Sequence, residues 1–478
     1  MFVGRMAELN KLNEMYTSGK FECAIIYGRR RVGKTTLIKE FIKNKRAIYF
    51  LAREADGSQN LTGFSNDVYA ITAPELARNA FFTDWERAFD YIYQISKNER
   101  LILAIDEYPY LAGGYGPVSS IIQAHIDTRL KDSKLFLIIC GSSMGFMEKQ
   151  VLAYKSPLYG RRTAQFKVLP FSFFESSPFF DGAVNFDKAL YYGMTGGIPE
   201  YLAKIDMRKS FRDNAISLFF TPQGYMFEEP MNLLREELRE PSTYNGIIEA
   251  VATGATRLND IASKCGMESN KCVKYLSSLI MLGIIKKEIP VTETASKKSM
   301  YLVDDIMFRF WYRFVFHNLS GIVSGLGAAI FDNEVSGQIS SYMGFIFEDI
   351  CKQYLISAAK KGGLPFFTAR IGKWWGNNPK LRRQEEIDAL AVGINSRIDE
   401  VSAIGGAILL CECKWTNSPV DIDVLDDLTE QGSLFPQYEE QWYWLFSKSG
   451  FTEKLHAAAA ERSECVKLIS YDDMVLGP

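Results

Sequence analysis

Histidine is scarce in this sequence, with three in 478 residues, and the eight cysteines are scattered. No histidine lies near a cysteine pair, so the spacing that zinc sites require is missing. The sequence therefore does not predict a zinc site. We expect the cysteines to be reduced thiols.

A strong charge imbalance and long apolar runs are also missing. The formal net charge is −2, which argues against a protein that coats nucleic acid indiscriminately, although local basic patches remain compatible with it. The longest uninterrupted apolar runs, such as Leu135–Cys140, fall far short of the ~20 residues of a bilayer helix. The first ten residues carry two charges where a signal peptide has an apolar segment. We expect a cytoplasmic protein with no membrane partner.

The length predicts several domains, because single cores stop growing near roughly 250 to 300 residues. Hydrophobic residues make up 47% of the chain and charged residues 23%. This composition is typical of packed cores and excludes a mainly disordered chain. We expect two to four domains.

A glycine-rich turn follows the apolar run Cys23–Tyr27 and precedes a segment of helical spacing. It has the pattern G-x-x-x-x-G-K-[ST], which turns backbone N–H groups toward phosphate oxygens at a helix N-terminus. Lys34 would reach the β- and γ-phosphates, and Thr35 would offer its hydroxyl to Mg²⁺. The predicted nucleotide-binding residues of this turn are Gly28, Arg31, Val32, Gly33, Lys34, Thr35 and Thr36.

A second signal is the continuous apolar run Leu101–Ile105, which is typical of a strand buried on both faces of a parallel sheet. It ends in Asp106 and Glu107. Asp106 would hold the Mg²⁺ and Glu107 would orient and deprotonate the attacking water, as phosphoryl transfer requires. These roles predict hydrolysis of a nucleotide.

Further strands are expected at Ala47–Leu51 and Leu135–Cys140, with helical stretches near Trp85–Ile95 and Ile121–Leu130 between the strands. This alternation predicts an α/β fold with a parallel sheet and a ligand at the carboxyl ends of the strands. Ser142 follows one of these ends. Its hydroxyl would either sense the γ-phosphate and position the water, or cap a helix.

Five segments together resemble the archaeal-type ATPases of the AAA-related signal-transduction (STAND) group. They are Phe2–Arg5 with Glu8 and Leu9, the phosphate loop, Leu101–Glu107, Gly141–Ser143 and Gly196–Leu202. The resemblance covers roughly residues 1–220 and implies ATP as the nucleotide and a helical lid after the sheet. It also implies that Arg5 lies near the base of the site and that Pro199 packs over the nucleotide. Arg161 and Arg162 are candidates for a cationic finger, or they form a basic surface turn.

The middle of the chain predicts three short helices, near 244–251, 258–262 and 269–282, followed by a hairpin at 284–289 and 300–303. This is the outline of a winged helix-turn-helix. Residues 256–300 hold eight Lys and Arg against four Asp and Glu, so contact with DNA is chemically feasible. The same fold also serves as a spacer or a protein-docking module. The aromatic run Phe308–Phe316 is expected to be a core between domains rather than a base-stacking surface.

The C-terminal part contains spaced carboxylates. Glu412 and Lys414 project from one face of an expected strand, because side chains repeat with a period of two. If Asp388 ends the neighbouring strand and Glu348 comes from the preceding helix, three carboxylates and an ammonium converge. Such a set could hold Mg²⁺ and stabilise charge during phosphodiester hydrolysis. A salt-bridged pair on a sheet is the plainer interpretation.

This pattern is similar to the restriction-endonuclease-like superfamily, whose motif is an acidic residue followed by (D/E)-x-K, and to the C-terminal domain of unknown function in the archaeal-type ATPases. The resemblance implies that Glu348, Asp388 and Glu412 are metal ligands and Lys414 is a catalytic lysine. The stretch Ala369–Gln384 holds five basic residues, no acid and two tryptophans. It suits a phosphate backbone and an unstacked base, or it is a solvated loop.

The sequence thus predicts an ATPase core at 1–165, a lid at 166–240, a winged helix at 241–305, a helical linker at 306–335 and a nuclease-like domain at 336–478. We expect a switch ATPase with ATP and Mg²⁺ as cofactors and DNA or RNA as partner, in a monomer or a homo-oligomer. Nucleotide state would gate the C-terminal site. The alternatives are an ATP-dependent DNA-binding scaffold that does not cut and an NTP-driven assembly factor.

Overall fold

A computed structural model describes residues 2–293, 298–379, 381–394 and 406–477. The chain divides into two compact units. The first comprises Met1–Pro170 with Ile198–Glu200, and the second comprises Phe171–Gly197 with Tyr201–Pro478. This division is coarser than the five segments that we expected, and it splits the expected lid at 166–240 between the units.

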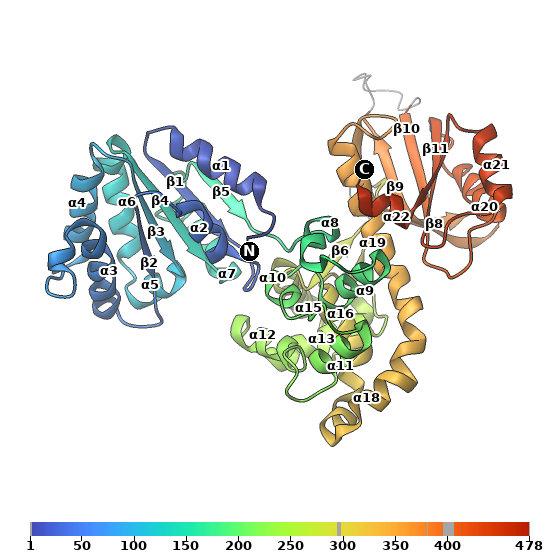
Figure 1. Cartoon of the computed structure of the whole chain (residues 1–478), viewed down its shortest axis with the longest axis horizontal. Coiled ribbons are helices and arrows are strands. Elements are labelled where there is room, and N and C mark those ends of the chain that lie inside the picture. Colours follow the sequence, from blue (N-terminus) through green and yellow to red (C-terminus); the bar gives the residue numbers. More distant parts are fainter. Residues whose placement is uncertain (1, 294–297, 380, 395–405, 478) are drawn as a thin grey trace. The chain divides into compact units, whose positions relative to one another are not determined.

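The first unit is a five-stranded parallel sheet in the order β2-β3-β4-β1-β5, with helices on both faces (Figure 1). The strands are β1 Glu22–Tyr27, β2 Ala47–Leu51, β3 Leu101–Asp106, β4 Leu135–Gly141 and β5 Ala164–Lys167. The helices are α1 Met6–Thr17, α2 Lys34–Ile42, α3 Gly57–Thr72, α4 Trp85–Ser96, α5 Tyr108–Gly114, α6 Val118–Thr128 and α7 Met144–Phe146. The predicted parallel α/β fold is confirmed.

The central strands β3 and β4 are buried along their whole length. Their apolar runs carry no alternation because helices cover both faces of the sheet. The sequence correctly predicted these strands and α4. It predicted neither β5 nor α3, since β5 has only one buried residue and α3 is rich in polar and glycine residues.

The second unit begins with helices and a small hairpin. The helices are α8 Phe173–Ser176, α9 Asn185–Thr195, α10 Pro199–Leu202, α11 Phe211–Phe219, α12 Glu229–Glu237, α13 Pro241–Ala252, α14 Leu258–Lys264 and α15 Ser269–Met281. The first two residues of α10 belong to the first unit. Strands β6 Ile285–Glu288 and β7 Met300–Val303 pair in antiparallel fashion. Three helices and a hairpin therefore lie where the sequence predicted them.

The next helical run contains α16 Ile306–Phe314, α17 Leu319–Gly321, α18 Gly327–Ile330 and α19 Ile339–Lys360. Phe308, Phe310 and Trp311 of α16 are buried, as expected for a core. Among the described residues, Ile306–Lys360 is the one helical run long and apolar enough to cross a membrane by length and composition, a test that core helices of soluble proteins also pass. Gly325, at φ 85°, interrupts the helical geometry inside this run.

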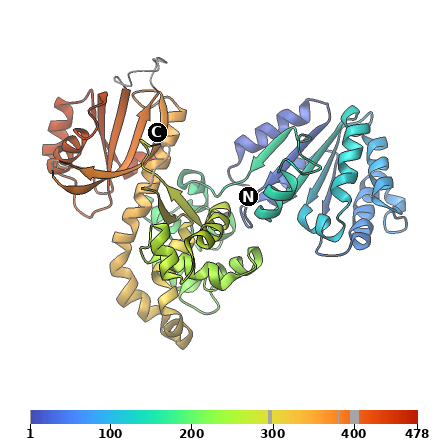
Figure 2. The ribbon, with the colours of Figure 1, turned by 180° about the vertical axis from the view of Figure 1, so that it is seen from behind.

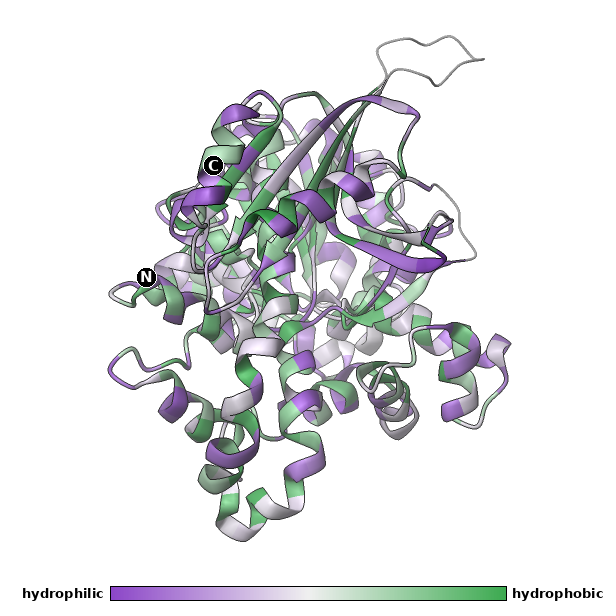
Figure 3. Ribbon diagram, turned by 90° about the vertical axis from the view of Figure 1, so that its right-hand side faces the viewer, coloured by the Kyte–Doolittle hydropathy of each residue, from purple (hydrophilic) through white to green (hydrophobic). Residues whose placement is uncertain are grey.

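The C-terminal part of the second unit is a five-stranded mixed sheet in the order β12-β11-β10-β9-β8. The elements are β8 Thr368–Asn378, β9 Arg383–Gly393, β10 Gly406–Lys414, α20 Ile422–Gly432, β11 Tyr438–Ser447, α21 Glu453–Glu461, β12 Val466–Ser470 and α22 Tyr471–Leu476. Helices α19 and α22 lie on one side of the sheet, and α20 and α21 lie on the other (Figures 1 and 2). Figure 3 shows hydrophobic residues concentrated along these strands.

Candidate functional site

The phosphate loop joins β1 to α2. Gly33 has φ 90° and Arg31 has φ 67°, so both adopt left-handed backbone. Gly28 is required for a different reason, because a Cβ there would lie 2.3 Å from the carbonyl oxygen of Val168. The two glycines of the motif, Gly33 and Gly28, therefore permit a positive φ and a close backbone approach, respectively.

Lys34 is the first residue of α2 and is almost fully buried. Its ammonium donates a 2.9 Å hydrogen bond to the carbonyl oxygen of Arg29 within the same loop. The side chain thus lies along the loop whose amides would face phosphate oxygens. Its predicted contact with the β- and γ-phosphates stays a prediction.

Asp106 ends β3 and is completely buried. Its Oδ2 accepts hydrogen bonds from the hydroxyls of Thr35, at 2.7 Å, and Tyr49, at 2.8 Å. Its Oδ1 accepts one from the backbone N–H of Glu107, at 2.9 Å. Thr35 and Asp106, the two predicted Mg²⁺ ligands of this unit, therefore meet directly.

Tyr49 is a member of this site that the sequence analysis missed. It lies on β2, beside β3 in the parallel register. Burial and the Asp106 carboxylate raise the pKa of its phenol. The signal for it was a polar tip in an apolar strand, which becomes informative only once the strand order places β2 beside β3.

Glu107 follows Asp106 with φ 52°, in the left-handed region. Its Oε2 accepts hydrogen bonds from the hydroxyl of Ser142, at 2.8 Å, and from the Ser142 N–H, at 3.4 Å. Ser143, and not Ser142, is the N-cap residue of α7, and its side chain makes no capping hydrogen bond. Ser142 therefore does not cap α7 and instead contacts Glu107, whereas its predicted role toward the γ-phosphate or the water stays a prediction.

Arg5 supports the loop from its own side. Its guanidinium donates hydrogen bonds to the carbonyl oxygens of Val32, at 3.1 Å, and Leu169, at 2.6 Å. Pro199 lies over Gly33, since a Cβ on that glycine would be 3.8 Å from the Pro199 ring. Both residues therefore border the phosphate loop, and their roles toward a nucleotide stay predictions.

The candidate arginine finger has a different setting. Arg161 forms an ion pair with Asp127 of α6, at 2.7 Å, and Arg162 lies over the ring of Tyr159, 5.5 Å from its centroid. Arg161 thus has the setting of a surface turn, whereas Arg162 is half-buried. The role of this pair as a cationic finger stays a prediction.

The C-terminal carboxylates lie on α19, β9 and β10. Glu412 and Lys414 form an ion pair at 2.6 Å, as expected for one face of a strand. Asp388 accepts a 2.9 Å hydrogen bond from the backbone N–H of Cys413. It lies inside β9 rather than at its end, because β9 continues to Gly393. The condition that Asp388 ends its strand is therefore not met, although its side chain does contact β10.

These carboxylates influence one another. Burial, with the charge of Glu412 next, raises the pKa of Asp388 to about 6. Burial, with the charge of Asp388 next, raises the pKa of Glu348 to about 7. Burial also raises the pKa of Glu412, and Glu348 adds to this shift. Mutual repulsion of this kind means that the three predicted ligands lie in one charged neighbourhood.

Lys373 of β8 is a further member of this neighbourhood. Its ammonium lies 2.9 Å from Oε2 of Glu348 and also pairs with Glu386. The predicted basic stretch is therefore not a surface that faces nucleic acid throughout. Trp374 packs on Phe435, Trp375 donates its Nε1–H to the carbonyl oxygen of Lys298, and Lys380 lies outside the described residues.

The donor set fits Mg²⁺ in its chemistry, since all three predicted ligands offer the hard oxygens that this ion prefers. The geometry of the set does not fit a metal ion. Within the described ranges, no three His, Cys, Asp or Glu side chains converge closely enough to hold one. Two of the three carboxylates are instead paired with the ammonium groups of Lys373 and Lys414.

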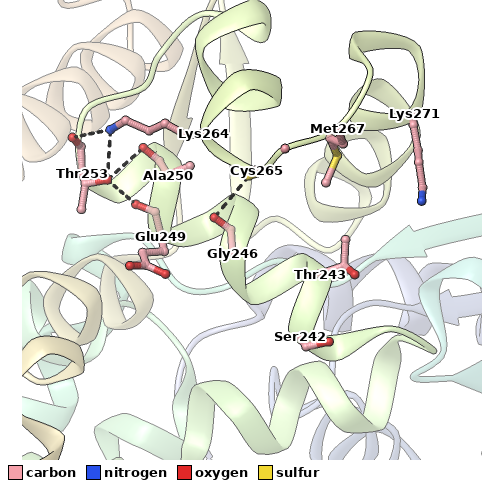
Figure 4. A pocket seen from close by; sticks show the side chains of 11 residues that line it. Ser242, Thr243, Gly246, Glu249, Ala250, Thr253, Lys264, Cys265, Met267 and Lys271 are labelled. Carbon is pink, nitrogen blue, oxygen red and sulfur yellow. Dashed lines mark hydrogen bonds between the residues drawn. The ribbon is translucent and has the colours of Figure 1, made fainter.

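A surface pocket of about 590 Å³ lies between α13 and the α14–α15 turn. Figure 4 shows Lys264 reaching toward Thr253, on the opposite side from Lys271. Cys265 lies between them and donates its thiol to the carbonyl oxygen of Gly246, at 3.5 Å. The pocket thus has a polar lining and two ammonium groups.

Both the parallel sheet and the phosphate loop of the first unit are those of a P-loop ATPase. Residues 2–205 match the model of an ATPase domain found predominantly in Archaea, and residues 311–425 match a domain of archaeal and bacterial proteins of unknown function. An uncharacterized protein of Methanocaldococcus jannaschii, MJECL04, is 36% identical over 417 residues, 87% of this chain and 88% of that protein. The chain belongs to the family of this relative, and its residues 2–205 form the ATPase domain found predominantly in Archaea.

Three further similarities are more limited. The uncharacterized ATP-binding protein MJ0423 of Methanocaldococcus jannaschii is 52% identical over 46 residues, which are 10% of this chain and 78% of that protein. Among solved structures, the Walker-type ATPase PABY2304 of Pyrococcus abyssi covers 65% of this chain and 96% of its own, at 19% identity and a TM-score of 0.49. The Aeropyrum pernix ORC2 protein covers 67% and 94%, at 13% identity and a TM-score of 0.42.

Proposed function

We propose that the chain is a switch ATPase that binds and hydrolyses ATP in its first unit and acts on nucleic acid through its second. The ATPase domain is shared with the family, and the 2.7 Å hydrogen bond between Thr35 and Asp106 is the main observation in support of this site. Lys34 and the loop amides would bind the phosphates. Thr35 and Asp106 would hold Mg²⁺, which neutralises charge on phosphate oxygens.

Glu107 is the proposed proton acceptor for the attacking water. Its hydrogen bond from Ser142 fixes the carboxylate at the carboxyl end of the sheet, where ligands of parallel α/β folds bind. Asp106 does not compete for this role, because both its oxygens already accept hydrogen bonds. Radiolabelled ATP turnover by the purified chain, with Lys34→Ala as the inactive variant, tests this part of the proposal.

The three-helix and hairpin module is proposed to be a winged helix that binds DNA. Its element order, α13, α14, α15, β6 and β7, supports this assignment. On α15, Lys271 and Lys274 are exposed, so they are available to phosphate groups. Loss of binding to a labelled DNA duplex in a Lys271→Ala, Lys274→Ala double variant would support the proposal. Unchanged binding would favour a spacer.

For the C-terminal domain we propose a Mg²⁺-dependent phosphodiesterase. Glu348, Asp388 and Glu412 would hold the ion, which would supply Lewis-acid stabilisation of a phosphate, and Lys414 would stabilise negative charge on the transferring group. The hard oxygen donors of these three carboxylates, which raise one another's pKa, support this function. DNA and RNA cleavage should be lost in Asp388→Ala while ATP turnover is retained.

The competing function is an ATP-dependent scaffold whose C-terminal fold does not cut. The observation in its favour is that Lys373 and Lys414 already neutralise Glu348 and Glu412. If the purified chain, given Mg²⁺ or Mn²⁺ and ATP, never nicks DNA or RNA, the scaffold is the better description. ATP binding and hydrolysis would then not regulate cleavage at the C-terminal site.

A further inference from the structure

Tyr49 donates a hydrogen bond at the centre of the ATPase site without being one of its proposed ligands. Its phenol lies 2.8 Å from Oδ2 of Asp106, the oxygen that also accepts the 2.7 Å hydrogen bond of Thr35. Asp106 is completely buried, and a buried carboxylate requires donors that compensate for the loss of water. The phenol of Tyr49 is one of these donors, at the oxygen that the first turn of α2 also contacts.

The register of the sheet brings Tyr49 to this oxygen. Tyr49 pairs with Ala104 of β3, and Leu51 pairs with Asp106. Ala104 and Asp106 share one face of β3, because side chains repeat with a period of two, and they are about 6.6 Å apart along the strand. The small side chain of Ala104 leaves room above it, so the long phenol of Tyr49 extends over it toward Asp106.

Helix α2 also contacts the ring of Tyr49. The ammonium of Lys39 lies over this ring, 5.3 Å from its centroid, and a cation over an aromatic face is attracted to it. Lys39 follows Thr35 by four residues on α2, so the two side chains lie on the same face of the helix. Tyr49 and its partner Asp106 are therefore contacted by α2 at two successive turns.

The two hydroxyl donors to Asp106 differ in their position in the fold. Thr35 belongs to the phosphate-loop motif and is the proposed hydroxyl ligand of Mg²⁺. Tyr49 comes from β2, the edge strand of the sheet, and lies outside the loop. Its hydrogen bond to Asp106 therefore does not depend on how the loop and Thr35 engage a nucleotide. A residue that orients a metal ligand in this way typically contributes roughly 10- to 100-fold to metal affinity.

We propose that Tyr49 is a positioning residue of the ATPase site, which holds the carboxylate of Asp106 in the orientation that serves the Mg²⁺ of bound ATP. The proposal rests on the function proposed for the first unit. Thr35 and Asp106 offer hydroxyl and carboxylate oxygens, and Mg²⁺ usually takes one or two carboxylates together with phosphate oxygens and water. Tyr49 acts through Asp106 and contacts neither ATP nor the ion itself.

The test measures the affinity of the full chain for a fluorescent, non-hydrolysable ATP analogue, once with Mg²⁺ and once with excess EDTA. Tyr49→Phe removes the hydroxyl and keeps the ring beside Lys39, so the fold is retained. It should weaken binding with Mg²⁺ by about 10- to 100-fold and leave binding in EDTA unchanged, because only the ion depends on Asp106. Tyr91→Phe is the matched control. Tyr91 is another half-buried tyrosine of the first unit, and its hydroxyl donates to Thr72, so this variant should match the wild type under both conditions.

Equal weakening with and without Mg²⁺, or no weakening, would overturn the proposal, since a purely structural role does not distinguish the two conditions. Asp106→Asn provides a second measurement, because it should itself lose the gain from Mg²⁺. Adding Tyr49→Phe to it should have no further effect, and a further loss would show that Tyr49 does not act through Asp106.

The same titration separates this proposal from the function on which it rests. If the wild type binds the analogue under neither condition, the ATPase site as a whole is wrong, and the role of Tyr49 with it. If the wild type binds more tightly with Mg²⁺ and Tyr49→Phe does the same to an equal extent, the site stands and only the role of Tyr49 is removed.

Discussion

The hydroxyl of Thr35 donates a 2.7 Å hydrogen bond to the carboxylate of Asp106, although the two residues lie 71 positions apart. The first turn of α2 and the end of β3 therefore meet at one point. The meeting follows from the strand order, since β1 and β3 both pair with β4 and all three run parallel. Their carboxyl ends must then lie at the same edge of the sheet.

Lys34→Ala should weaken ATP binding by about 10- to 100-fold, because a charge-assisted hydrogen bond to phosphate contributes roughly 1.5 to 3 kcal/mol. Titration with a fluorescent ATP analogue measures the effect. Lys43→Ala is the control. Lys43 follows the same helix, but its side chain is 63% exposed and pairs with Glu40. Equal affinity in both variants would remove Lys34 from the site.

Glu107→Gln should lower the rate of ATP hydrolysis by about 10²- to 10⁴-fold while leaving ATP affinity nearly unchanged, because the amide cannot accept the proton of the water. Ser142→Ala should have a smaller effect, since it removes only the hydrogen bond that orients Glu107. Single-turnover phosphate release separates the two variants. A larger loss in Ser142→Ala than in Glu107→Gln would contradict these roles.

The sequence predicted the first site better than the second for a physical reason. The phosphate loop is local: eight consecutive residues form it, and its neighbour Asp106 follows a buried strand. The C-terminal site depends on long-range pairing. Lys373 was assigned to a basic stretch because nothing along the chain reveals that β8 pairs with β9 and that the Lys373 ammonium meets Glu348 of α19.

Asp349→Ala should destabilise the second unit by about 3 to 5 kcal/mol, since its carboxylate lies among Lys286, Arg309 and Lys352 and its loss leaves buried cations uncompensated. Asp332→Ala is the matched control. Asp332 pairs with Arg212 on the surface, where both side chains are more than 40% exposed, so its removal should cost about 0 to 1 kcal/mol. Denaturant unfolding measures both values.

The same variant has a predictable pH dependence. The three cations hold the pKa of Asp349 far below its ordinary value of 3.8. A carboxyl group with a lowered pKa in the folded state stabilises the fold above its unfolded pKa, and this contribution is lost as the pH falls. The difference in unfolding free energy between the wild type and Asp349→Ala should therefore shrink below about pH 4. A constant difference down to pH 2 would contradict the assignment.

The effect of Asp388 on the pH dependence of stability should have the opposite sign to that of Asp349, and Asp388→Asn should remove it. The pKa of Asp388 is raised from 3.8 to about 6 in the folded state, so the folded chain retains a proton that the unfolded chain releases. The stability of the wild type should therefore fall as the pH rises from about 4 to 6, and the drop should be of order 1 to 3 kcal/mol. Asparagine cannot ionise, so the variant should lack this drop and be the more stable protein at pH 8.

The control for this prediction is Asp426→Asn, an exposed carboxyl of α20, which should follow the wild type at every pH. The side-chain amide in Asp388→Asn can still accept the hydrogen bond that the backbone of Cys413 donates to Asp388, so the fold does not lose that contact. A variant that gains stability at pH 8 and loses phosphodiester cleavage would show that the charge at Asp388 is retained at the expense of stability. If Asp388→Asn is less stable than the wild type at pH 8, the carboxylate instead serves to hold β9 and β10 together.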